Sequence, residues 1–139
     1  MATELFTIAG GAIFVLLGIV HLLYTFRDIA RPRRLVPDDP QVAEAMKNSS
    51  LRLTRGKTSM WSAWVGFNFS HSLGVIWFGA SCIVLGIATT LFPIPKHALL
   101  TPIFFGALFL WLAVRYWFRI PAIGIALGTI LLAAGWLTY

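Results

Sequence analysis

"LFTIAGGAIFVLLGIVHLLYTF", residues 5–26, decides the fold of this chain, because it holds no charged side chain over 22 positions. A helix rises about 1.5 Å per residue, so this run is long enough to cross the roughly 30 Å hydrocarbon core of a bilayer. Glu4 precedes the run, the basic residues follow it, and no small-residue cleavage site stands after it. A secretory signal peptide would begin with cations, so we expect a retained membrane span.

The rest of the chain repeats this apolar character. The composition is 58% hydrophobic and 12% charged, whereas a soluble domain has roughly 25% charged residues. Apolar runs near the length of a bilayer crossing favour helices over the shorter, alternating strands of a membrane barrel. The sequence therefore predicts an all-α polytopic membrane protein, a four-transmembrane-helix bundle in which Pro121 opens the last helix. The predicted spans within a single membrane domain, 1–139, are about 5–26, 61–91, 98–118 and 121–138.

The distribution of the cations predicts the orientation. Loop 27–60 and the connection between the last two spans would lie on one side of the membrane, and only Lys96 would lie on the other. Cytoplasmic loops are enriched in Lys and Arg, so we expect this loop in the cytoplasm of a bacterial inner membrane and both termini outside. The net charge of +6 then faces anionic headgroups, and the lipid bilayer, not a nucleic acid, is the expected partner. The cations on the loop side are Arg27, Arg31, Arg33, Arg34, Lys47, Arg52, Arg55, Lys57, Arg115 and Arg119.

A short helix is expected within this loop. The segment "PDDPQVAEAMKNSS", residues 37–50, offers an aspartate as N-cap and Pro40 as the first helical residue. Val42, Met46 and Leu53 fall near one face. We predict an amphipathic helix that lies on the membrane surface.

Small residues recur at helical spacing in two of the predicted spans. Gly66, Ser70 and Gly74 are spaced by four, and Gly124 and Gly128 repeat the pattern in the last span. Such stripes let another helix backbone approach closely. We predict helix packing at all five positions, either inside the bundle or against a partner.

A second stripe of the same span is polar. Asn68 shares a helix face with His71 or Ser72, because residues three and four apart lie on one face. Polar groups in a span need partners, since lipid offers none. Other spans supply the remaining candidates. The predicted polar cluster or ligand-binding site comprises His21, Tyr24, Asn68, His71, Ser72 and Arg115.

Three interpretations of this cluster stay open. It is an interhelical hydrogen-bond cluster, or a site for an apolar molecule with one polar end, such as a quinone, a sterol-like lipid or an isoprenoid, or a b-type haem site with His21 and His71 as ligands. Two histidines without a carboxylate or thiolate make a poor metal set, so no metal and no cofactor is favoured. The sequence identifies no catalytic residue. The enzymatic alternative is proton shuttling by His71 with Tyr24 or Asp28, as in a double-bond isomerase.

The stretch "TSMWSAWVGFNFSHSLG", residues 58–74, contains a W-x-x-W-x-G-F-N-x-S-H-S-L-G motif. Together with "LLGIVHLLYTF", "VAEAMKNSSLRLTRGKTSMW" and "YWFRIP", it resembles an uncharacterised family of short bacterial four-span membrane proteins. The resemblance implies the four-helix architecture, with His21, Asn68 and His71 as shared features, and it implies no activity. We expect a non-enzymatic accessory or binding protein, alone, as a homo-oligomer or with other membrane subunits. A binder or isomerase acting on an apolar ligand is the alternative.

Overall fold

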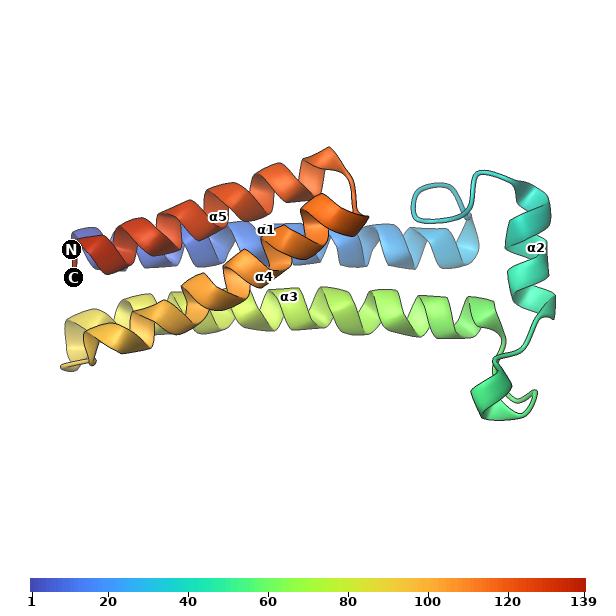
Figure 1. The fold of residues 1–139 in the computed structure, drawn as a ribbon, viewed down its shortest axis with the longest axis horizontal. Coiled ribbons are helices and arrows are strands. Elements are labelled where there is room, and N and C mark those ends of the chain that lie inside the picture. Colours follow the sequence, from blue (N-terminus) through green and yellow to red (C-terminus); the bar gives the residue numbers. More distant parts are fainter. The chain divides into compact units, whose positions relative to one another are not determined.

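The computed structural model describes residues 1–139 and is all-helical, without strands (Figure 1). Four helices are long and apolar enough to cross a membrane. The prediction of an all-α chain is confirmed, and four such helices indicate a multi-pass membrane protein. The elements are α1 (Ala2–Ala30), α2 (Pro40–Asn48), the short η1 (Arg52–Thr54), α3 (Met60–Leu91), the short η2 (Lys96–Leu99), α4 (Leu100–Tyr116) and α5 (Arg119–Leu137).

The helix boundaries differ from the predicted spans, and two of the differences have a clear physical reason. α1 continues past Arg27 and Asp28 to Ala30, because hydropathy marks the apolar part of a helix and not the end of its hydrogen bonding. α5 begins at Arg119, two residues before Pro121. Proline is tolerated there because the backbone N–H groups of a first turn have no partner inside the helix.

The helices form two compact units, which we name by the number of long helices in each. The four-helix unit comprises residues 1–18 and 74–139, and it contains the first part of α1, the second part of α3, η2, α4 and α5. The two-helix unit comprises residues 19–73, with the remaining parts of α1 and α3 and the loop elements α2 and η1.

Glycines allow close helix contacts in the four-helix unit. A Cβ atom on Gly79 of α3 would lie 2.5 Å from the Gly11 carbonyl oxygen of α1. One on Gly128 of α5 would lie 2.8 Å from the Phe14 ring, and one on Gly124 would lie 3.1 Å from Leu17. Gly124 and Gly128 of α5 therefore lie directly against α1.

The other small-residue stripe does not pack inside the chain. A Cβ atom added to Gly66 or Gly74 would meet no atom within 4 Å, and Ser70 is exposed. Within the chain this stripe contacts no other helix, so its predicted packing against a partner stays a prediction. The buried face of α3 instead carries Asn68, Ser72 and Val75.

Aromatic rings fill the centre of the four-helix unit. Phe14 of α1 is fully buried, and its ring meets that of Phe78 edge-on, with centroids 4.8 Å apart. α4 and α5 lie side by side (Figure 1). At the far end of the unit, the hydroxyl groups of Thr3 and Thr138 are 3.2 Å apart, so the two chain ends meet (Figure 1).

The loop of the two-helix unit contains the predicted short helix. The Asp39 carboxylate accepts a hydrogen bond from the Gln41 N–H at 2.8 Å, and Pro40 opens α2. Hydrogen bonds from Lys47 and Asn48 lower the pKa of the Glu44 carboxyl. No residue of α2 is buried. Leu53 is not part of its apolar face, because it lies in η1, where it is 94% exposed.

Candidate functional site

His21 and Asn68 form the centre of a polar cluster in the two-helix unit. His21 Nε2 lies 2.9 Å from Asn68 Oδ1. The amide nitrogen of Asn68 donates to the Trp64 carbonyl oxygen, one turn earlier in α3, at 2.8 Å. Asn68 is only 7% exposed. A polar side chain in an apolar helix is thus paired both within its own helix and across to α1.

The second histidine lies directly beside the first. The ring centroids of His21 and His71 are 5.2 Å apart, with the planes at 75°. The Phe67 ring is nearly parallel to that of His71, at 6.1 Å. Both histidines are half-buried. We call His21, Asn68, His71 and Ser72 the polar layer.

Two hydroxyl groups beside this layer donate hydrogen bonds to backbone carbonyl oxygens. The Ser72 hydroxyl is fully buried and donates to the Asn68 carbonyl oxygen at 2.7 Å. The Thr25 hydroxyl donates to the His21 carbonyl oxygen at 3.0 Å. Each hydroxyl thus donates to a carbonyl oxygen one turn earlier in its own helix, as Ser and Thr side chains commonly do. Ser72 therefore shares the buried face of α3 without donating to either imidazole.

Two of the six predicted site residues have other neighbours. Tyr24 lies under the Arg34 guanidinium, whose carbon is 5.4 Å from the ring centroid. Arg115 belongs to the four-helix unit, where it is exposed and lies 5.2 Å from the Tyr116 ring centroid. Trp111, four residues before Arg115, meets Tyr116 edge-on.

Asp28 has a role that the sequence did not predict. Its carboxylate is 1% exposed and accepts the backbone N–H groups of Arg33, Arg34 and Leu35, the last at 2.6 Å. Asp28 thus fixes the start of the basic loop. The signal for this role was a lone acidic residue just before a turn containing Pro32.

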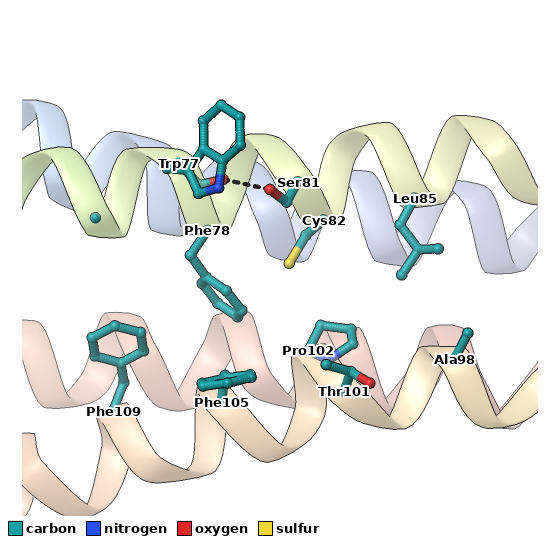
Figure 2. A pocket seen from close by; sticks show the side chains of 11 residues that line it. Trp77, Phe78, Ser81, Cys82, Leu85, Ala98, Thr101, Pro102, Phe105 and Phe109 are labelled. Atoms are coloured by element: carbon teal, nitrogen blue, oxygen red, sulfur yellow. Dashed lines mark hydrogen bonds between the residues drawn. The ribbon is translucent and has the colours of Figure 1, made fainter.

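A second candidate site is an apolar groove between α3 and α4 in the four-helix unit. Figure 2 shows Phe78 of α3 directed towards Phe105 of α4. The open groove has a volume of about 670 Å³, within the range of small-molecule sites. Its few polar groups include the Ser81 hydroxyl, which donates to the Trp77 carbonyl oxygen. The groove is lined by Gly74, Trp77, Phe78, Ser81, Cys82, Leu85, Ala98, Thr101, Pro102, Phe105 and Phe109.

The geometry of the polar layer bears on its chemistry. Axial imidazoles on opposite faces of a haem are separated by the porphyrin, whereas the rings of His21 and His71 are in edge contact. No three His, Cys, Asp or Glu side chains gather closely enough to hold a metal ion. The residues of the polar layer therefore fit hydrogen bonding better than metal ligation.

Comparisons with protein-family models, with curated proteins and with solved structures found no match. The resemblance to the four-span bacterial family stays a prediction.

Proposed function

We propose that this chain is a non-enzymatic binding or accessory subunit of the bacterial inner membrane, and that the polar layer is its functional site. The observation that carries the proposal is the hydrogen bond between His21 and Asn68. This bond joins two apolar helices at a contact that aliphatic side chains could fill equally well. A polar residue within a membrane span is by default a candidate for function.

Three features support a binding role over a catalytic one. The hydrogen-bonding groups of Asn68 are used within the protein. The carboxylate of Asp28, one of the two proton partners that the isomerase alternative offers to His71, already accepts three backbone N–H groups. The apolar groove between α3 and α4, and the exposed stripe at Gly66, Ser70 and Gly74, offer surfaces for lipid or a partner helix.

The proposal includes an orientation. Loop 27–60 lies in the cytoplasm and both termini lie outside, because the cations gather in this loop and beside the corner between α4 and α5. α2 then lies on the inner membrane surface, where its unburied apolar residues enter the headgroup region.

The test begins with the protein purified in mild detergent. Mass spectrometry of its lipid extract should reveal a stoichiometric apolar molecule, and partner chains that purify with it would identify an accessory role. A visible spectrum with a Soret band would instead indicate haem and contradict the proposal.

Substitutions separate binding from folding. His71→Ala and Asn68→Ala should abolish ligand retention while the protein still inserts and stays monodisperse. Ser70→Ala is the matched control, because its exposed hydroxyl donates only to the Phe67 carbonyl of its own helix. Aggregation of both variants, with a normal control, would show that the polar layer serves only to hold the helices together.

A further inference from the structure

The orientation of the Asn68 amide is fixed by its surroundings. One end of the amide faces the Trp64 carbonyl oxygen at 2.8 Å, and a carbonyl oxygen only accepts hydrogen bonds. The amide nitrogen must therefore face Trp64. A flipped amide would bring two acceptor oxygens together at that distance, so the atom that faces His21 is the oxygen Oδ1.

This orientation determines where the His21 proton lies. Because Oδ1 only accepts, the nitrogen that faces it, Nε2 at 2.9 Å, must carry the hydrogen. In a neutral imidazole one nitrogen donates and the other accepts. Nδ1 of His21 is consequently left with a lone pair that can only accept.

The lone pair is accessible from outside the protein. The only side-chain hydrogen bond of the His21 imidazole is the one to Asn68. No buried side-chain nitrogen or oxygen in the protein lacks a partner, so Nδ1, which has none, is not buried. His21 thus presents a hydrogen-bond acceptor that is not fully buried, and the buried Asn68 holds its ring in position.

Because Nε2 of His21 donates and Nδ1 accepts, we infer that the polar layer binds an apolar molecule through a hydroxyl group, which donates its hydrogen bond to His21 Nδ1. The inference rests on the proposed binding function and specifies its ligand class. Alcohols and quinols have the required donor. Quinones and ethers of the same shape have only hydrogen-bond acceptors. The lone pair of their oxygen would therefore face the lone pair of Nδ1.

The surroundings suit the apolar body of such a ligand. Phe67, whose ring is nearly parallel to that of His71, is 66% exposed. A hydroxyl group bound at His21 would therefore be attached to a hydrocarbon body in an apolar environment, where an unmade hydrogen bond is costly.

The test compares ligand pairs that differ in the hydroxyl hydrogen, with the purified full-length protein at alkaline pH. The pairs are farnesol with its methyl ether, and decylubiquinol with decylubiquinone under anaerobic conditions. We expect the hydroxyl member of at least one pair to bind about fivefold to tenfold more tightly, as one hydrogen bond predicts. The pair that shows this preference identifies an isoprenoid alcohol or a quinol.

Two other outcomes would overturn the inference, in different ways. Equal binding within each pair, or tighter binding of the ether and the quinone, would contradict the acceptor role of Nδ1 while the binding function stands. Binding of neither member of either pair would count against the inference and against ligand binding by the polar layer together.

Variants provide a second readout. His21→Phe keeps a planar ring but removes Nδ1, so the preference for the hydroxyl member should fall to about onefold. The matched control is His97→Phe, because His97 is an exposed histidine in η2 of the other unit. A preference that survives His21→Phe would place the acceptor on another residue.

Discussion

Asn68 joins the two long helices of the two-helix unit. It links α1 to α3 through His21 and is itself held by the Trp64 carbonyl. Its type and its helix face could be read from the sequence, and so could the neighbouring His71. Its partner could not, because any polar group on another span was equally suitable before the packing of α1 against α3 was known.

Removal of either partner should destabilise the protein. In Asn68→Ala the half-buried His21 N–H loses its acceptor, which costs about 1 kcal/mol. A double-mutant cycle of His21→Ala and Asn68→Ala, measured by unfolding in mixed micelles, should give a coupling energy of about 1 kcal/mol. Additive effects of the two substitutions would show that no hydrogen bond joins these residues.

Asp28 should control the order of the loop start. In Asp28→Asn only one acceptor oxygen is left for the three backbone N–H groups that the carboxylate binds. We expect faster hydrogen exchange at the amides of Arg33, Arg34 and Leu35. The control is Asp38→Asn, an exposed position in the same loop. Unchanged exchange in Asp28→Asn would mean that the loop is held by other contacts.

At the scale of the helices, apolar runs predicted the existence of all four long elements but not how they pack. Several glycine stripes had the same spacing, and only the structure distinguishes those that pack from those that do not. Gly79 faces the α1 backbone, whereas Gly74, on the same helix, faces open space. The apolar groove was not foreseen, because aromatic residues occur throughout the spans and no pattern marks those that leave a space.

The two glycines of α3 should respond differently to a methyl group. Gly79→Ala would place Cβ 2.5 Å from the Gly11 oxygen and 2.7 Å from the Val15 nitrogen. Backbone atoms cannot easily move, so we expect a loss of about 1–3 kcal/mol. Gly74→Ala should change the free energy of unfolding by less, within about 1 kcal/mol, and in the stabilising direction, because alanine favours helix. Equal losses in both variants would contradict the observed contact between α1 and α3.

At the scale of the whole molecule, the prediction of a multi-pass membrane protein rests on composition and charge. The four helices agree with it, while the orientation rests on the distribution of cations alone. The division into a four-helix and a two-helix unit had no counterpart in the sequence, since hydropathy is similar along each run and gives no information on where helices contact one another.

The orientation is open to a labelling test. In a Cys82→Ser background, a cysteine at His97 should react with a membrane-impermeant maleimide on intact cells, and a cysteine at Gln41 should react only after the cells are opened. Both positions are exposed, so protection by the protein itself would not explain a difference. The reverse pattern would place the basic loop outside.

The central claim is the bond from His21 Nε2 to Asn68, and nitrogen NMR of the protein labelled at its three histidines tests it most directly. The His21 signals are identified by their loss in His21→Phe. We predict a single neutral tautomer with the proton on Nε2, which becomes a mixture of tautomers in Asn68→Ala. A proton on Nδ1, or a mixture already present in the unmodified protein, would contradict the account.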